Sequence, residues 1–564
     1  MLRHSRYWGV FLALSVTLVA GCHTPSSHSD AAAVSIDGSP APGATNSFST
    51  DKLAVAHAHY AAGVIFEMDD DADAALEEFY QAAMGDPATE DLVLDVSRRL
   101  LQKKQPEKAL ELLLRATAQP DASGPVFARL GVIYSQIGKT NEAIAAENQA
   151  IKRSPGSLAG YQALYVTCLQ NKRNQEALAV LNQAAKQKTV NVSFLLGLSE
   201  LYQTYGLQVP EQKEKAKAGS LAALNRAAKL NPADPAIELK LAESFITLGA
   251  SDKAAEIYLD LLKRLPDVPY IRERVHAQLA DIYLRESEHK QAVEQLEAII
   301  RDDPANPQAY FFLGSIAADE RKPAEAAEYF SKTVLLSPDF EPAYYELATA
   351  QLDNSKPADA LATLEKARRK FSQSFVLEFL TGAAYGRQKA WTEAIQHYTA
   401  AEIIGEAADS KRLSYIFYFQ FGAVCERKGD LEQAEKYFQK CLQLQPNFDE
   451  AQNYLGYMWA EHGIKLPEAR ELIEKAVKAE PENAAYLDSL GWVLFKLDQP
   501  KAALPYLLKA VQLSTEPDPS LYDHLGDIYA ALKEPAKARE AWQKSLSLEA
   551  NETIRKKLEA PADH

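Results

Sequence analysis

Apolar residues recur along most of this chain with the period of an amphipathic α-helix, in short segments separated by polar turns. The segments come in pairs, and a small residue on the first is followed twelve positions later by an alanine on the second. These pairs are Gly63 and Ala75, Ser97 and Ala109, Gly131 and Ala143, Ala242 and Ala254, Ala280 and Ala292, Gly314 and Ala326, Ala348 and Ala360, Gly382 and Ala394, Gly422 and Ala434, Gly491 and Ala503, and Gly526 and Ala538. Because a small side chain lets the alanine of the neighbouring helix approach closely, this spacing predicts an all-α chain of packed helix pairs.

Successive pairs are mostly 34 residues apart, as in the series that begins at Gly63 and the one that begins at Ala280. A proline often follows the alanine by twelve positions and would end the second helix, as at Pro87, Pro155, Pro266, Pro304, Pro338 and Pro446. Asp430, three residues before Gln433, has the spacing of a helix N-cap. This period and pattern resemble the tetratricopeptide repeat (TPR). The resemblance implies a solenoid, or superhelix, of about fourteen helix-turn-helix repeats between residues 56 and 550.

The period is interrupted in three places, and we expect three arrays at residues 51–240, 241–405 and 406–555, followed by a polar tail at 556–564. The longer spacings contain the segments VPEQKEKAKAG, PDVPYIRERV and GEAADSKRLSYIFYF. Insertions in a solenoid form loops or lengthened helices. They mark either bends between arrays or tolerated loops, and for each insertion singly we expect the tolerated loop.

The first residues have the layout of a secretory signal peptide. Arg3 and Arg6 precede an almost wholly apolar run from Tyr7 to Ala20, which is too short to span a membrane comfortably. Val19-Ala20-Gly21-Cys22 resembles the lipobox of bacterial lipoproteins, which implies a signal peptide at 1–21 and a lipidated Cys22. The alternative is an ordinary secreted protein with a chance cysteine at this position.

The residues that follow Cys22 indicate where the folded part would lie. Residues 22–50 are rich in Ser, Ala, Pro and Gly and predict a flexible tether behind the lipidated cysteine. In enterobacterial lipoproteins an aspartate at the position of His23 favours the inner membrane, so we expect a lipid anchor in the bacterial outer membrane, facing the periplasm. The formal net charge of −16 argues against nucleic acid and anionic lipid, and favours basic or neutral protein partners.

No pattern in the chain predicts catalysis, a cofactor or a metal site, so we expect a protein that is not an enzyme. Gly138-Lys139-Thr140 lacks the earlier glycine of a phosphate-binding loop and predicts a turn between two helices. His57 and His59 do not share a helix face and are not expected to bind a metal together. Cys425 and Cys441 fall on the two helices of one repeat. They form either a disulfide or, as we expect, two buried thiols, and Cys168 is expected to be a buried thiol as well.

TPR arrays present the first helix of each repeat along a concave face, and the resemblance implies partner contacts near positions 2, 5, 9 and 12 of the repeat. With the small residue as position 8, position 5 is aromatic in five repeats, at Phe194, Phe311, Tyr345, Phe379 and Phe419. A row of such rings would supply apolar area, at low rotamer cost, for an extended or helical peptide. Alternatively the rings pack against neighbouring repeats, and both interpretations stay open.

The last three repeats differ at these positions. Position 5 holds Asn453, Asp488 and Asp523, and position 9 holds Tyr457, Trp492 and Asp527. These residues depart from the Lys and Asn of the carboxylate-clamp repeats that grip chaperone C-termini, so a chain-terminal carboxylate is not the expected ligand. The mixed aromatic and acidic character favours a basic segment of a partner protein.

Three C-terminal segments carry a more specific resemblance: NYLGYMWAEHG, AAYLDSLGWVLFKLDQPKAALPYLLKA and DHLGDIYAALKEPAKAREAWQKSL. They are similar to the C-terminal repeats of a group of proteobacterial TPR lipoproteins, which includes an adaptor of the periplasmic carboxyl-terminal processing protease. The resemblance implies a lipid-anchored periplasmic scaffold that brings substrates to such a protease. The alternative is a scaffold for an envelope export machine, such as one for pilus secretin assembly or exopolysaccharide export.

Overall fold

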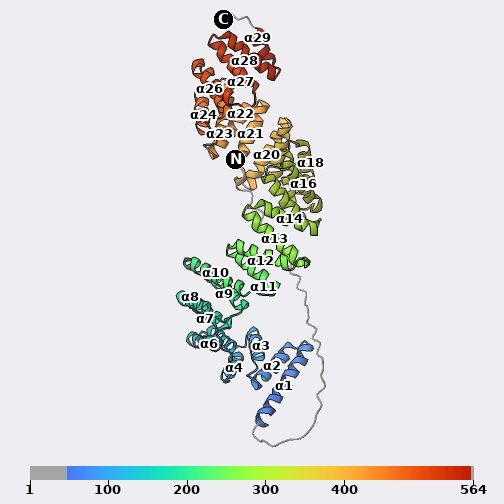
Figure 1. Ribbon diagram of the computed structural model, residues 1–564, viewed down its shortest axis with the longest axis vertical. Coiled ribbons are helices and arrows are strands. Elements are labelled where there is room, and N and C mark those ends of the chain that lie inside the picture. The colour runs from blue at the N-terminus through green and yellow to red at the C-terminus, as the bar shows by residue number, and fades with distance from the viewer. Residues whose placement is uncertain (1–46, 409, 560–564) are drawn as a thin grey trace. The chain divides into compact units, whose positions relative to one another are not determined.

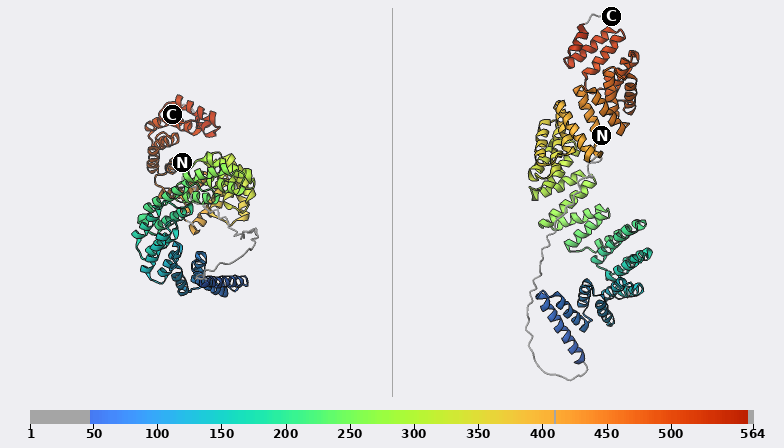
Figure 2. Two further views of the ribbon diagram at one scale, coloured as in Figure 1. Left: turned by 60° about the horizontal axis from the view of Figure 1, so that its bottom comes forward. Right: turned by 180° about the vertical axis from the view of Figure 1, so that it is seen from behind.

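The computed structural model describes residues 47–408 and 410–559, and these residues form helices joined by short turns, with no strand among them. The predicted signal peptide, Cys22 and most of the predicted tether lie outside the described residues. The chain divides into two compact units, which meet in sequence at Ser287 and Glu288. Within each unit, Figures 1 and 2 show successive helices stacked side by side in chain order. The all-α prediction is therefore confirmed.

The first unit contains thirteen α-helices and one short 3₁₀ helix. Their bounds are α1 Ser47–Met68, α2 Ala72–Gly85, α3 Glu90–Gln102, α4 Pro106–Thr117, α5 Gly124–Gln136, α6 Thr140–Arg153, α7 Leu158–Gln170, α8 Asn174–Ala185, α9 Val192–Gln208, η1 Pro210–Gln212, α10 Lys213–Lys229, α11 Pro235–Thr247, α12 Ser251–Arg264 and α13 Pro269–Arg285.

The second unit contains the remaining helices of the described chain. Their bounds are α14 His289–Asp302, α15 Pro307–Asp319, α16 Pro323–Leu336, α17 Glu341–Asp353, α18 Pro357–Lys370, α19 Phe375–Arg387, α20 Trp391–Ala408, η2 Ser410–Arg412, α21 Tyr415–Lys428, α22 Leu431–Leu444, α23 Asp449–Glu461, α24 Leu466–Ala479, α25 Ala484–Lys496, α26 Pro500–Leu513, α27 Pro519–Ala531, α28 Pro535–Leu548 and α29 Glu552–Glu559.

The predicted helix pairs are present in both units. In the second unit α21 packs on α22, α23 on α24, α25 on α26 and α27 on α28, and each first helix also contacts the next first helix. The alanines of the twelve-residue offset are buried throughout. Asp430 caps α22 as expected, because its carboxylate accepts a hydrogen bond from the Gln433 amide at 3.2 Å. The 28 helices α1 to α28 match the fourteen predicted helix pairs in number and order.

The small residue at position 8 makes room for a different neighbour than we expected. A Cβ atom added to Gly63 would lie 2.7 Å from the ring of Phe79, and one added to Gly314 would lie 2.8 Å from the ring of Phe330. The same close approach joins Gly422 to Phe438, at 2.9 Å. The space left by the glycine is therefore filled by the large side chain sixteen positions later, rather than by the alanine twelve positions later.

The three insertions lengthen helices instead of forming the tolerated loops that we expected. The helices α9, α10 and α13 have 17 residues each and α20 has 18, whereas most other helices have 13 or 14. At the first insertion the segment EKAKA consists of residues that favour helix continuation. The expected array boundaries at residues 240 and 405 consequently fall inside α11 and α20. The tail expected at 556–564 begins inside α29, at residues that are helical.

Several residues singled out in the sequence have structural roles. Cys168, Cys425 and Cys441 are all buried, and all three are free thiols. Gly138 adopts a left-handed backbone conformation, with φ of 78°, in the turn between α5 and α6. Nδ1 of His59 lies 2.6 Å from Glu78, whereas His57 is exposed. Among the described residues we find no helix long and apolar enough to cross a membrane.

Candidate protein-binding face

The five aromatic residues predicted at position 5 pack within the array. Phe194 is only 3% exposed and meets Tyr161 edge to face, with 6.0 Å between ring centroids. Phe311 contacts Phe330 and Phe340, at centroid distances of 5.5 and 5.1 Å. Burial of Phe194 excludes a direct surface role for its ring, so packing is the better interpretation there.

The other aromatic residues of this row are half-buried rather than exposed. Tyr345 donates a hydrogen bond to Glu341, at 2.6 Å, and its hydroxyl lies 3.0 Å from that of Ser374. Phe379 lies in a cluster with Phe375, Tyr398 and Phe417, and Phe419 in one with Phe438, Phe448 and Tyr454. Each ring is therefore partly covered, by contacts that lie within the protein.

The first helices of the last three repeats carry a connected polar and aromatic cluster. The Trp492 indole of α25 stacks on the His524 imidazole of α27, with 3.9 Å between ring centroids and 16° between ring planes. Trp492 also donates a hydrogen bond from Nε1 to Glu461, at 2.7 Å. Tyr457 of α23 approaches His524, at a centroid distance of 6.2 Å. His524 thus contacts three residues that the sequence predicted for the binding face. Its ring meets those of Tyr457 and Trp492, and its Nδ1 lies within hydrogen-bond distance of Asp488.

The pairing of His524 with Asp488 joins α27 to α25. Nδ1 of His524 lies 3.0 and 3.1 Å from the two carboxylate oxygens of Asp488. Although burial alone disfavours the charged ring, this carboxylate raises the pKa of His524 above its ordinary value. The sequence reasoning missed His524, because it occupies position 6 and only positions 5 and 9 were considered.

Asp523 and Asp527 of α27 lie on either side of one cation. Nζ of Lys557, in α29, lies 2.8 Å from Asp523 and 2.7 Å from Asp527. Trp542 of α28 donates a hydrogen bond from Nε1 to Asp527, at 3.0 Å. Burial raises the pKa of Asp527, and its bonds to Lys557 only partly oppose this. The predicted acidic surface is therefore partly neutralised by the chain itself, through a lysine that we had assigned to a polar tail.

Asn453 begins the same position-5 row, one helical turn before Tyr457 on α23. It is 8% exposed, and its side-chain Oδ1 has no hydrogen-bond partner. A buried amide oxygen without a donor is unfavourable, by roughly 1–3 kcal/mol. The candidate face therefore comprises Asn453, Tyr457, Asp488, Trp492, Asp523, His524 and Asp527, on α23, α25 and α27. Asn453, Trp492 and His524 are buried beneath it, and the four half-buried residues, Tyr457, Asp488, Asp523 and Asp527, are the ones a partner could touch.

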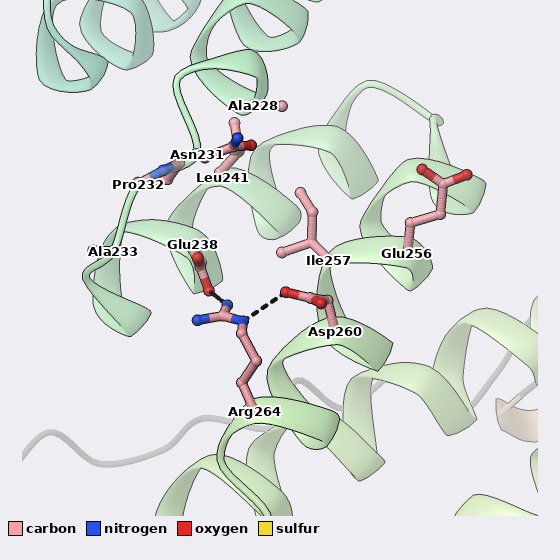
Figure 3. A pocket seen from close by; sticks show the side chains of 10 residues that line it. All are labelled: Ala228, Asn231, Pro232, Ala233, Glu238, Leu241, Glu256, Ile257, Asp260 and Arg264. Atoms are coloured by element: carbon pink, nitrogen blue, oxygen red, sulfur yellow. Dashed lines mark hydrogen bonds and ion pairs between the residues drawn. The ribbon is translucent and has the colours of Figure 1, made fainter.

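A surface hollow elsewhere, in the first unit, does not offer comparable chemistry. It has a volume of about 410 Å³ and lies between α10, α11 and α12 (Figure 3). Glu238 and Asp260 both point at the guanidinium of Arg264, and Nε of Arg264 lies 2.7 Å from Asp260. Because these two acids share one arginine, the charges of the hollow are largely satisfied internally. Among the described residues, no group of three or more His, Cys, Asp and Glu side chains could hold a metal ion.

Comparisons with curated proteins find two partial relatives from Pseudomonas aeruginosa. TPR repeat-containing protein PA4667 is 38% identical over 104 residues, which cover 18% of this chain and 17% of that protein. Type IV pilus assembly protein PilF is 31% identical over 137 residues, which cover 24% of this chain and 54% of that protein. The chain therefore spans less than two thirds of either relative.

Solved structures with similar helix arrangements share little sequence. The APC/C hetero-tetramer Cut9–Hcn1 is 17% identical, over 82% of this chain and 94% of that chain, with a TM-score of 0.38. The structure of Naa15/Naa10 bound to HypK-THB is also 17% identical, over 81% of this chain and 68% of that chain, with a TM-score of 0.39.

Two family models described as tetratricopeptide repeat match the chain. One matches residues 217–269, 278–339, 345–411 and 465–520, and the other matches 125–157, 415–448 and 519–552. Together they cover more than half of the chain. The repeat period, the helix pairs and these matches agree, and the chain belongs to the tetratricopeptide repeat family.

Proposed function

We propose that this protein is a lipid-anchored scaffold of the bacterial envelope that binds other proteins through its C-terminal repeats. The observation that carries the proposal is the candidate face, where three successive first helices place half-buried acidic groups and Tyr457 beside a connected cluster of Tyr457, Asp488, Trp492 and His524. Cys22 would hold the protein to the outer membrane through its lipid, and residues 22–50 would let the repeats stand away from the bilayer.

The first candidate role is that of an adaptor for a periplasmic carboxyl-terminal processing protease. The C-terminal segments that resemble such lipoproteins include α23, α25 and α27, which build the candidate face. An adaptor of this kind acts by proximity, because holding protease and substrate on one array raises their effective concentration. No catalytic group of the array is needed for this role.

The second candidate role is assembly of an envelope export machine. The similarity to the type IV pilus assembly protein PilF supports it, since the matched residues make up about half of that protein. In this role the array would hold a subunit of the machine near the membrane during assembly. Repeat similarity alone does not transfer a partner from one TPR protein to another.

Affinity purification from envelope extracts separates the two roles. The tagged full-length protein would be isolated from cells after mild detergent extraction, and the bound proteins would be identified by mass spectrometry. Enrichment of a protease and cell-wall hydrolases supports the first role, and enrichment of secretin or pilus components supports the second. The proposal is overturned if the tagged protein enriches neither set over an untagged control.

The anchor has a separate test. Replacing Cys22→Ser removes the only thiol that could be lipidated at the predicted cleavage site. We expect the variant to move from the membrane fraction to the soluble fraction in cell fractionation, while the wild type stays with the membrane. Continued membrane association of the variant would contradict lipid anchoring at Cys22.

A further inference from the structure

Lys557 continues the row of position-5 residues along the array. It lies on α29, a helix that resembles the first helix of another repeat. It follows Asp523 by 34 residues, which is the period of the array, and Asp523 follows Asp488 by 35. Lys557 therefore takes position 5 of a further repeat, of which the structure describes only α29. The position-5 row reads Asn453, Asp488, Asp523 and then Lys557, so that a row of acidic and amide groups ends in a cation.

The site that receives Lys557 is built to bind a cation. Its ammonium group lies between two carboxylates, 2.8 Å from Asp523 and 2.7 Å from Asp527, and 5.9 Å from the Trp542 ring centre. The Trp542 bond to Asp527 holds that carboxylate in place. Two carboxylates facing one ammonium leave a net negative charge, and a planar guanidinium could bond both carboxylates at once. Lysine and arginine side chains both fit this chemistry.

The helix that carries Lys557 is held to the array by few residues. The helix α29 has eight residues, and Ile554, which is 3% exposed, is its one buried residue. Leu558 is half-buried, whereas Arg555 and Lys556 are exposed. A helix of eight residues with one buried apolar anchor opens at a lower free energy than the longer paired helices before it.

We propose that Asp523, Asp527 and Trp542 form a binding site for a lysine or arginine side chain of a partner's basic segment, and that Lys557 occupies this site until the partner displaces it. The inference rests on the proposed scaffold function and specifies which part of the candidate face selects the partner. In the free protein α29 competes with the partner as an internal ligand, at the high effective concentration of a tethered group.

The structure itself supplies a probe for this site. A fluorescein-labelled peptide of residues 551–560, NETIRKKLEA, would be titrated with full-length protein and followed by fluorescence anisotropy. The protein variant Ile554→Ala with Lys557→Gln removes both anchors of α29 and leaves the site open. We expect this variant to bind the peptide about ten-fold more tightly than the wild type does, because the internal competitor is lost.

Two matched changes establish that the carboxylates bind the lysine. The same peptide carrying Lys557→Gln should bind the open variant about ten-fold more weakly, as should the original peptide when Asp523→Asn and Asp527→Asn are added to that variant. Unlabelled hexa-arginine should displace the probe, and hexa-glutamate should not. Melting temperatures check that each variant is folded. The single variant Lys557→Gln, which keeps Ile554, serves if the double variant does not fold.

Equal affinity of the wild type and the open variant, or affinity that is indifferent to the two Asp→Asn changes, would overturn the proposal and make α29 a permanent cap. That result would not overturn the scaffold function. A scaffold that binds its partners through other repeats would fail this titration and still enrich envelope proteins in affinity purification.

Discussion

The rings of Trp492 and His524 stack face to face, with 3.9 Å between their centroids, on the first helices of consecutive repeats. Nδ1 of His524 also lies 3.0 Å from Oδ1 of Asp488, within hydrogen-bond distance. The three side chains come from positions 5, 6 and 9 of the repeat, so one histidine bridges two residues of the preceding helix. Because the imidazole is stacked and bonded at the same time, its charge state is coupled to the packing of α25 against α27.

The first prediction concerns the pH dependence of this contact. Asp488 raises the pKa of His524 above its ordinary value of 6.5, although burial acts in the opposite direction. The protonated ring is therefore favoured in the folded state. Its stabilisation is fully present below pH 6.5 and is lost as the pH rises through the raised pKa. We expect the melting temperature of the C-terminal repeats to fall across this range.

Differential scanning calorimetry of the wild type and of His524→Gln, between pH 6 and pH 9, measures this effect. The variant should lose the pH-dependent part of the melting temperature. His57→Gln is the matched control, since His57 is exposed and lies in the first unit. An unchanged pH slope in His524→Gln would show that another group is responsible.

The second prediction concerns Glu147, a residue of α6 whose carboxyl group is buried in the protein interior. It is 0% exposed, its Oε1 accepts a hydrogen bond from Thr167 at 2.7 Å, and its Oε2 has no partner. Burial raises the pKa of Glu147 to about 7, and the hydrogen bond from Thr167 only partly offsets this rise. The protonated acid is favoured in the folded state, so its contribution to stability is present below the ordinary carboxyl pKa of 4.5. That contribution is lost as the pH rises through about 7.

Glu147→Gln should therefore stabilise the first unit at pH 8, by up to roughly 3 kcal/mol, and leave it little changed at pH 5. Denaturant unfolding at the two pH values checks this expectation. Glu142→Gln, on the exposed side of the same helix, is the control and should change stability at neither pH. Equal effects of Glu147→Gln at both pH values would contradict the burial of an ionisable acid.

The third prediction distinguishes packing from partner contact in the aromatic row. Phe379 touches Phe375, Tyr398 and Phe417 and is half-buried, so Phe379→Ala should destabilise the second unit by about 2 kcal/mol. Leu335→Ala, at a residue that is 78% exposed on α16, should leave the melting temperature unchanged. Loss of partner binding in Phe379→Ala at an unchanged melting temperature would instead assign this ring to the binding surface.

The fourth prediction concerns the cysteines. Burial raises the pKa of Cys425 and that of Cys441 to about 12, so neither forms the reactive thiolate at neutral pH. With Cys22→Ser, the folded protein should react negligibly with Ellman's reagent. When the same protein is unfolded in guanidinium without reductant, the reagent should detect three reactive thiols per chain. A count of one would reveal a disulfide between Cys425 and Cys441.

The helix pairs could be predicted from the sequence because the small residues that close helix packing needs recur at a fixed spacing. Gly422 and Ala434 have the twelve-residue offset that recurs in ten other helix pairs, and both are buried. The lengthened α10 could also have been predicted, since its segment EKAKA favours helix over loop. We expected loops because an insertion of unknown geometry is most easily placed outside a regular repeat.

The chemistry of the candidate face could be predicted only in part. The register placed Asp488, Trp492, Asp523 and Asp527 on first helices correctly. It could not assign His524 and Lys557 as their partners, because these contacts cross between helices and depend on how neighbouring repeats are rotated. It also could not tell that Phe194 is buried whereas Phe311 and Phe379 are half-buried, because the burial of a position-5 residue depends on the neighbouring helices.

The close approach of Gly63 to Phe79, repeated at Gly314 with Phe330 and Gly422 with Phe438, has a consequence for how such arrays change over evolution. A bulkier residue at one of these glycines would overlap the ring sixteen positions later unless that ring moved or were replaced by a smaller side chain. The two members of such a pair are therefore fitted to each other. The smallest exchangeable piece of this protein is a whole helix pair, and recombination within a repeat would join surfaces that were fitted to other neighbours.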